Sequence, residues 1–302
     1  MSTSPEARAW MRVSADALRR NYARIRGAVG PATGIIPMVK ADAYGLGMRE
    51  TVRALGEEGP LGWGVATLDE GLRLRELGTT GRVVVFCPLP HDSLELAVAA
   101  ALQVTVSNLE SVERLAAVGR QTHLLPEIHV DVDTGMGRSG FDWQRASEWL
   151  PRVEELAQDG VRWVGCYSHL HSAEDDEGSV REQATRLQAV LDRIANPPAG
   201  FLVHLLNSAG ALRLPELARD AVRPGIFLYG GRVGPEQPAP EAVASVHARV
   251  VHTREASPGT TLGYGATYRA RRQERWATLA IGYGDGLPRA LGNRGQALLG
   301  GG

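Results

Sequence analysis

The stretch that decides the fold spans residues 34–47 and reads Gly-Ile-Ile-Pro-Met-Val-Lys-Ala-Asp-Ala-Tyr-Gly-Leu-Gly. Its apolar first half predicts a buried strand, and its glycine-bearing second half predicts a turn at the carboxyl end of that strand. Lys40 stands at the junction and is the one lysine among 33 basic residues, the others all being arginines. Only a lysine offers an amine that can lose its proton and attack a carbonyl. We therefore interpret Lys40 as a reactive amine and not as a surface lysine retained by chance.

Outward from this stretch, short runs rich in Val and Ile alternate with longer runs of helical periodicity. We expect strands at residues 35–39, 62–66, 83–87, 103–106, 127–132, 161–168, 202–206 and 223–229. Helices are expected at 15–29, where Ser14 provides an N-cap, and between the strands, for example at 67–77, 108–118, 143–156 and 180–194. A doubly wound sheet would fit fewer strands, whereas eight βα units match a (β/α)8 barrel. The predicted fold class is thus α/β, with a TIM-like (β/α)8 barrel over residues 8–236.

The pattern changes near Pro238, where a proline-containing segment predicts a linker. Beyond it, residues 242–251 and 274–281 are expected to form strands with no helix between them. We therefore predict a second, β-rich domain over residues 237–302, to which residues 1–13 add a strand. The chain stops at Ala297-Leu298-Leu299-Gly300-Gly301-Gly302, where a further strand is expected to begin, so this domain is predicted to be incomplete.

The composition excludes several classes of protein. The net charge is -1 and the arginines are scattered, which gives no sign of a nucleic-acid partner. There is no apolar run of membrane-spanning length, and the first six residues do not resemble a signal peptide. Cys87 and Cys166 occur in apolar runs without metal-ligand spacing, so we expect two buried free thiols in a reducing compartment and no metal site. The protein is expected to be cytoplasmic, without a membrane partner.

The candidate functional residues follow the predicted strands. In a barrel, the side chains that carry out chemistry lie at the carboxyl ends of the strands and in the loops after them. Unusual polar or glycine-containing segments occur at these ends, namely Lys40 and residues 131–140, 168–171, 207–210 and 223–226. Each segment alone could be a cap or a turn, but their coincidence on one rim indicates a site. A reactive lysine beside hydroxyl groups and glycine backbone donors indicates an aldehyde cofactor with a phosphate, which is pyridoxal 5'-phosphate (PLP).

Six motifs, taken together, are specific: Val39-Lys40-Ala41-Asp42-Ala43-Tyr44-Gly45, Asp133-Thr134-Gly135-Met136-Gly137-Arg138, His204-Leu205-Leu206-Asn207-Ser208, Arg223-Pro224-Gly225, Gly263-Tyr264-Gly265-Ala266-Thr267-Tyr268 and Ile281-Gly282-Tyr283-Gly284-Asp285-Gly286. With them the chain resembles the alanine racemases, which are barrel-type (fold type III) PLP-dependent enzymes, from about residue 8 to its end. The resemblance implies an isomerase that interconverts L-alanine and D-alanine, acts as a homodimer and supplies D-alanine for cell-wall peptidoglycan.

The resemblance also implies a role for each residue of these motifs. Lys40 and Tyr264 would be the two catalytic residues, Lys40 bound covalently to PLP and Tyr264 contributed by the partner subunit. The cofactor-binding residues would be Lys40, Tyr44, His169, Asn207, Ser208, Arg223, Gly225 and Ile226. Arg138 and Tyr283 would bind the substrate. The chain departs from the family at Asp131, where many members have a carbamate-bearing lysine. We hypothesise that Asp131 anchors Arg138 directly; the alternative is that it only caps a turn.

The chemistry of these residue types is consistent with racemisation. The Cα proton must be removed from one face and replaced from the other, which one base on each face accomplishes. A phenol has a reference pKa of about 10, so Tyr264 needs nearby positive charge, which a chain through His169 to Arg223 would provide. Arg223 would leave the pyridine nitrogen unprotonated, because a guanidinium does not give up its proton at ordinary pH. A carboxylate at that position would favour a decarboxylase instead.

Two other functions are compatible with these residues, and the sequence differs from the family pattern near its end. The nearest rival enzyme is a broad-specificity amino-acid racemase on the same scaffold, since no residue can be named that fixes a methyl side chain. The non-enzymatic rival is a PLP-binding homeostasis protein, which would be a lone barrel; Tyr264 and the start of a second domain argue against it. The departure is that the chain lacks the family's Met-Asp segment, which closes the partner's active site, and its further phosphate-binding tyrosine.

Overall fold

The computed structural model describes residues 7–299 and divides into two compact units, Ser14–Val243 and Met1–Val13 together with Ala244–Gly302. The predicted boundary between residues 236 and 237 lies a few residues before the division at Val243. Residues 1–6, where we expect no signal peptide, and residues 300–302 lie outside the described part. Residues 297–299, where a last strand was expected to begin, are not in a strand.

The larger unit is a parallel eight-stranded barrel, which confirms the predicted fold class. Its strands follow the order β2 (Gly34–Ile35), β10 (Ala221–Val222), β9 (Leu202–His204), β8 (Arg162–Tyr167), β6 (Glu127–Asp133), β5 (Gln103–Val106), β4 (Val83–Val85) and β3 (Trp63–Val65). A parallel bridge between Met38 and Gly64 closes the ring. The Gly64 N–H donates to the Pro37 carbonyl at 2.9 Å, and the Val39 N–H donates to the Gly64 carbonyl at 2.8 Å. A short strand, β7 (Phe141–Asp142), pairs with β6 outside this path.

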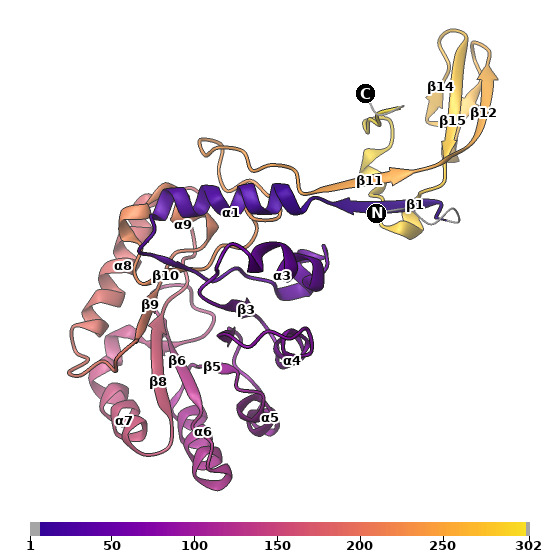
Figure 1. Ribbon diagram of the computed structural model, residues 1–302. Coiled ribbons are helices and arrows are strands. Elements are labelled where there is room, and N and C mark those ends of the chain that lie inside the picture. The colour runs from indigo at the N-terminus through magenta and orange to yellow at the C-terminus, as the bar shows by residue number, and fades with distance from the viewer. Residues whose placement is uncertain (1–6, 300–302) are drawn as a thin grey trace. The chain divides into compact units, whose positions relative to one another are not determined.

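Helices surround the strands on the outside (Figure 1). They are α1 (Ala15–Val29), α3 (Met48–Gly56), α4 (Leu68–Glu76), α5 (Leu94–Ala99), α6 (Leu109–Thr122), α7 (Ala146–Gln158), α8 (Glu177–Leu191) and α9 (Ser208–Arg213). Side chains cap several of them, including Ser14 on α1 and Thr67 on α4, where Glu70 completes a capping box. Their apolar faces pack on buried strands such as β4, whose three valines are fully buried. None of the helices formed by residues 7–299 is long and apolar enough to cross a membrane.

The eighth predicted strand, at residues 223–229, is wrong. The strand at this place is β10, which ends at Val222, and the apolar run beyond it forms hydrogen-bonded turns, including Leu228 N–H to Gly225 at 2.9 Å. Pro224 has no N–H to donate to a sheet, so the ladder stops there. Pro37 similarly shortens the first strand to β2, after which only the bridge at Met38 remains.

The smaller unit consists of three antiparallel pairs of strands. β1 (Ala9–Val13) pairs with β11 (Ala244–Ala248), and β12 (Val250–Ala256) pairs with β15 (Glu274–Leu279). β13 (Thr261–Leu262) pairs with β14 (Tyr268–Arg269). The predicted strand at 242–251 is therefore divided between β11 and β12. Between residues 244 and 299 the helical segments are short 3-10 turns, η4 (Tyr264–Ala266), η5 (Tyr283–Asp285) and η6 (Arg289–Leu291).

Candidate active site

A cavity of about 270 Å³ opens at the carboxyl ends of the barrel strands. The expected residues that line it are Lys40, Tyr44, Arg138, His169, Asn207, Ser208, Arg223, Gly225 and Ile226. Ala209, from the expected segment 207–210, lines it too, and six further lining residues were not expected from the sequence: Met38, Ala66, Phe86, Cys87, Tyr167 and Glu174. Ala66 and Phe86 directly follow β3 and β4, so the rule that found Lys40 could have found them as well.

The expectation of two buried thiols is half wrong. Cys166 is buried in β8, and its burial raises the pKa of the thiol. Cys87 is exposed and borders the cavity. The apolar run that suggested burial continues two residues past the end of β4 at Val85, which places Cys87 beyond the buried strand.

Lys40 opens a left-handed turn, α2 (Lys40–Tyr44). Residues 41–44 all have positive φ, between 51° and 57°, a conformation that costs about 1–2 kcal/mol for each residue with a Cβ atom. Glu70 holds this turn, because its carboxylate accepts the N–H of Ala41 at 2.6 Å and that of Ala66 at 2.8 Å. Strained backbone of this kind is maintained where its surroundings over-determine it, commonly at functional sites. Here it brings both Lys40 and Tyr44 to the cavity.

Tyr44, Ser208 and Gly225 form a polar cluster on one wall of the cavity. A Cβ atom on Gly225 would lie 2.1 Å from the Tyr44 hydroxyl oxygen, so only glycine fits there. The Ser208 hydroxyl accepts the Gly225 N–H at 2.8 Å, and the Tyr44 ring stacks on Tyr229 with centroids 4.6 Å apart. Burial raises the pKa of Tyr44, which therefore keeps its hydroxyl proton at neutral pH. The cluster suits an anion that accepts hydrogen bonds, such as a phosphate.

Asn207 and Ile226 reach the cavity beside this cluster. Asn207 is the N-cap of α9, and its side-chain oxygen accepts the Gly210 N–H at 3.0 Å. Its main role in the described structure is therefore to fix the loop that carries Ser208.

Arg223 is buried, and no carboxylate among residues 7–299 forms an ion pair or a hydrogen bond with it. Its Nη atoms donate to the carbonyls of His204 and Ser168, both at 2.8 Å, and its guanidinium lies 4.9 Å from the centroid of the Tyr167 ring. No hydrogen bond formed by residues 7–299 uses its Nε–H. Burial lowers the pKa of Arg223 to about 10, which still leaves it charged at neutral pH. The cavity thus has a fixed cation with a free donor.

A chain of buried side chains runs from Arg223 through the barrel, and we call it the donor chain. Its members are Arg223, His204, His129, Gln103 and Glu127, joined by contacts of 2.8 Å, 3.1 Å and 2.9 Å between the first four. Gln103 in turn donates to the Glu127 carboxylate. Burial lowers the pKa of His129 to about 3 and that of His204 well below its ordinary value, so both rings are neutral.

The direction of the donor chain fixes both histidine tautomers. Arg223 can only donate, so His204 Nδ1 accepts and its proton lies on Nε2. That proton is donated to His129 Nδ1, and the His129 Nε2 proton is donated to Gln103. Arg223 is therefore oriented by a run of hydrogen bonds that all point away from the active site.

His169 is also neutral. Burial, and after it the charges of Arg223, Arg138 and Lys40, lowers the pKa of His169 to about 3. Its Nδ1 lies 3.3 Å from Arg223 Nη2, so this nitrogen accepts and the proton lies on Nε2. Positive charge in this part of the site therefore belongs to the arginines and not to the imidazole.

Asp131 is buried and does not contact Arg138 in the way we expected. It accepts the hydroxyl of Ser139 at 2.8 Å and that of Ser107 at 3.4 Å. Neither a hydrogen bond nor an ion pair joins it to Arg138 in the described part of the chain. Burial raises the pKa of Asp131 to about 6, and the charges of Arg223 and Arg138 act against that rise. Asp131 therefore interacts with Arg138 only through their charges. Its carboxylate accepts its shorter hydrogen bond from Ser139.

Tyr264 and Tyr283 belong to the smaller unit. Tyr264 begins η4 and is 89% exposed, and Tyr283 begins η5 and is 60% exposed. Neither tyrosine is among the residues that line the cavity.

The fold and the cavity together define a barrel enzyme with one lysine at the rim of its cavity and a separate β-rich unit. The family model described as "Alanine racemase, N-terminal domain" matches residues 13–233, and "Alanine racemase, C-terminal domain" matches residues 243–302. The chain belongs to the alanine racemase family and is an isomerase. The match to a C-terminal domain is not what a lone PLP-binding barrel would give.

Relatives and solved structures agree with this assignment. The alanine racemase of Desulforamulus reducens is 33% identical over 301 residues, which cover 96% of this chain and 80% of that protein. The structure of alanine racemase from Bartonella henselae with covalently bound pyridoxal phosphate has a TM-score of 0.83 at 28% identity, covering 94% of this chain and 78% of that one. A histidine racemase from Leuconostoc mesenteroides has a TM-score of 0.84 at 28% identity, covering 95% and 77%.

Proposed function

We propose that this protein is a PLP-dependent alanine racemase that interconverts L-alanine and D-alanine by a two-base mechanism. The observation that carries the proposal is that the chain's single lysine shares one cavity with Arg223 and with the cluster of Tyr44, Ser208 and Gly225. These residues fit PLP, because the cluster suits a phosphate and the free Nε–H of Arg223 suits the pyridine nitrogen. When bound, PLP would supply the electron-withdrawing ring that makes the substrate's Cα proton acidic.

The roles of the chain's own residues follow from their chemistry. The Lys40 amine would hold the cofactor, and it would remove or return the substrate's Cα proton on one face. The Tyr264 hydroxyl of the partner subunit does the same on the other face. Arg223 keeps its own proton at neutral pH, since burial lowers its pKa only to about 10, so it would donate a hydrogen bond to the ring nitrogen of PLP without protonating it. Arg138 and Tyr283 would bind the substrate, Arg138 through the substrate carboxylate.

The proposal includes a homodimer in which each site is completed by the other subunit. It is supported by the exposure of Tyr264 and Tyr283 and by the family resemblance. The cellular role proposed is the supply of D-alanine for peptidoglycan, in the cytoplasm, where the free thiols of Cys87 and Cys166 would stay reduced.

A chiral assay tests the reaction itself. The full chain with PLP is supplied with each enantiomer of alanine, and the appearance of the other enantiomer is followed by chromatography. Because enantiomers have equal free energies, the ratio of kcat/KM in the two directions must be close to 1 for a racemase. Release of CO2, or an amino-group transfer product in place of the second enantiomer, would contradict the proposal.

A subunit-mixing experiment tests the shared site. Lys40→Ala and Tyr264→Phe variants are prepared separately, mixed under conditions that exchange subunits, and assayed. A heterodimer has one site with both changes and one with neither, so about a quarter of the wild-type activity should return in a statistical mixture. Mixing without recovery, in a sample shown to have exchanged, would place both bases on one subunit.

A second candidate function is a racemase of broader or different specificity. The Leuconostoc mesenteroides histidine racemase favours it, because that structure matches this chain as well as the alanine racemases do. A comparison of kcat/KM for alanine, serine and histidine decides between the two. A preference for alanine of about tenfold or more supports the first proposal.

A further inference from the structure

A second cavity, of about 490 Å³, lies at the opposite ends of the barrel strands. Leu61 and Arg82 stand just before β3 and β4, and Gln103 and Glu127 are the first residues of β5 and β6. The cavity is thus at the amino-terminal mouth, whereas the candidate active site is at the carboxyl-terminal mouth. Its volume falls in the range of small-molecule sites, about 300–1,000 Å³.

Arg82 is the unusual group in this cavity. One Nη atom donates a long hydrogen bond of 3.4 Å to the Leu61 carbonyl, and the buried Nε has no hydrogen-bond partner among residues 7–299. Burial lowers the pKa of Arg82, and the neighbouring charge of Arg162 lowers it further. Within the described chain no carboxylate pairs with Arg82, because the nearby Glu127 is occupied by Arg162 and Gln103.

The other arginine of the cavity behaves differently. Arg75 donates to the carbonyls of Thr79, Gly81, Ala100 and Ala101, at distances from 2.6 to 2.9 Å. Its guanidinium group is held in the wall by these carbonyls, yet no carboxylate among the described residues forms an ion pair with it. The lining therefore contains two guanidinium groups and a single carboxylate that is already paired. Since a half-buried cation without an anion is costly, the cavity favours an anionic occupant at Arg82.

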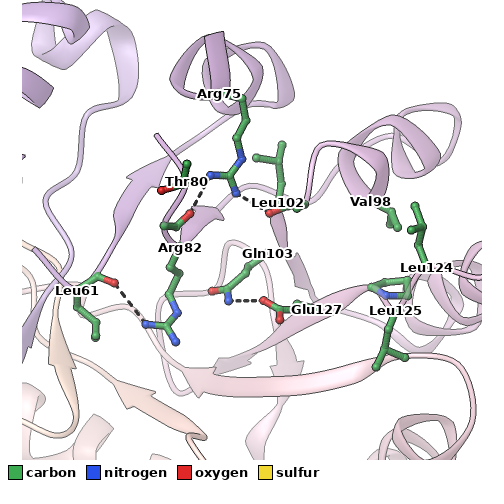
Figure 2. A pocket seen from close by; sticks show the side chains of 13 residues that line it. Leu61, Arg75, Thr80, Arg82, Val98, Leu102, Gln103, Leu124, Leu125 and Glu127 are labelled. Carbon is green, nitrogen blue, oxygen red and sulfur yellow. Dashed lines mark hydrogen bonds between the residues drawn. The ribbon is translucent and has the colours of Figure 1, made fainter. Parts of the chain in front are cut away.

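The remaining wall is apolar. Leu124 and Leu125 are 45% and 58% exposed, and Val98, Leu102 and Pro126 also line the cavity. Figure 2 shows these two leucines across from the Arg82 guanidinium, with Gln103 and Glu127 between them. Exposed leucines beside a cavity lose solvent contact when an apolar group enters it.

We propose that this amino-terminal cavity binds a small organic carboxylate whose charged end pairs with Arg82 and whose hydrocarbon part packs on Leu124 and Leu125. The proposal does not depend on the reaction at the other mouth. It names a ligand class with one anionic end and one apolar end of a few carbons, because the lining has one free cation among the described residues and one apolar wall.

Calorimetric titration of the full PLP-loaded chain with sodium hexanoate tests the proposal. Wild type should bind one hexanoate saturably, and saturating alanine should not displace it. Arg82→Gln should weaken binding by about tenfold or more, while 1-hexanol, which has the same chain without the charge, should bind at least about tenfold less tightly than hexanoate. The matched control Arg193→Gln removes an exposed arginine that makes no side-chain hydrogen bond in the described chain, and it should leave the affinity unchanged.

Leu125→Ser provides a second variant that does not depend on Arg82. Because Leu125 is exposed, the variant should fold, as far-UV circular dichroism would verify, yet it should weaken hexanoate binding by about three- to tenfold. Absence of saturable binding, equal affinity in wild type and Arg82→Gln, or displacement by alanine would each overturn the proposal.

Discussion

Replacing Gly225 by alanine is expected to displace Tyr44 and to weaken cofactor binding. The added Cβ would lie 2.1 Å from the Tyr44 hydroxyl oxygen and 2.9 Å from its Cζ. Ordinary contact begins at 3.4 Å, so the oxygen must move by roughly 1.3 Å. Tyr44 cannot easily move, because its ring stacks on Tyr229 and its backbone ends the left-handed turn after Lys40. Overpacking of this kind lowers the free energy of unfolding by about 1–3 kcal/mol. If PLP binding requires the Tyr44 hydroxyl to return to its place against the added Cβ, a cost of the same size raises the dissociation constant of PLP by about 5- to 150-fold.

Absorbance titration with PLP measures this effect, and Gly27→Ala serves as the control. Gly27 lies inside α1, where an added Cβ meets nothing within 4 Å. The control should bind PLP as wild type does and gain about 0.5–1 kcal/mol in stability, since alanine favours a helix. If Gly225→Ala bound PLP with wild-type affinity, the cluster of Tyr44, Ser208 and Gly225 would not be the phosphate site.

Three further changes test the supports of the site. Burial raises the pKa of Asp131 to about 6, so the folded protein holds that proton more tightly than the unfolded chain, and this residue's contribution to stability falls as pH rises from about 4 to 6. Asp131→Asn should remove the fall, gaining about 2 kcal/mol relative to wild type between urea titrations at pH 4 and pH 7. Parallel curves would contradict this. Glu70→Ala should lower the free energy of unfolding by about 1–3 kcal/mol and weaken PLP binding, whereas the control Glu76→Ala on the same helix should do neither. Equal effects of the two variants would contradict the role of Glu70 in holding the left-handed turn. His204→Phe keeps an aromatic ring beside Tyr167 but breaks the donor chain, so it should lower the free energy of unfolding by about 1–3 kcal/mol and weaken PLP binding through Arg223. An unchanged PLP titration would refute the link between the donor chain and Arg223.

The sequence predicts the barrel well because its local signals agree. The helix at residues 15–29 is right at both ends, since Ser14 caps it and Gly30 follows it. The rim residues could be found because each follows a valine- and isoleucine-rich strand. The apolar run at 226–229 gave the wrong eighth strand, because a short apolar run has no period that separates a strand from buried turns.

The features that were not predicted depend on contacts between distant parts of the chain. The donor chain joins β5, β6 and β9, and only the register of the closed barrel brings Gln103, His129 and His204 together. The left-handed turn after Lys40 has one local signal, which is Gly45. Residues 41–44 are held by Glu70, which belongs to α4 and lies far along the sequence. The partner of Asp131 was missed for the same reason, since Ser139 and Ser107 approach it from two different loops.

Deuterium incorporation from D2O tests the central claim most directly, namely that Lys40 and Tyr264 act on opposite faces of one Cα. The full chain with PLP is incubated with each enantiomer of alanine, and NMR follows deuterium at Cα while a chiral assay follows inversion. We predict exchange with inversion from both enantiomers in wild type, and exchange with retention from only one enantiomer in Tyr264→Phe. Inversion that persists at the wild-type rate in Tyr264→Phe, or exchange that survives in Lys40→Arg, would contradict the two-base account.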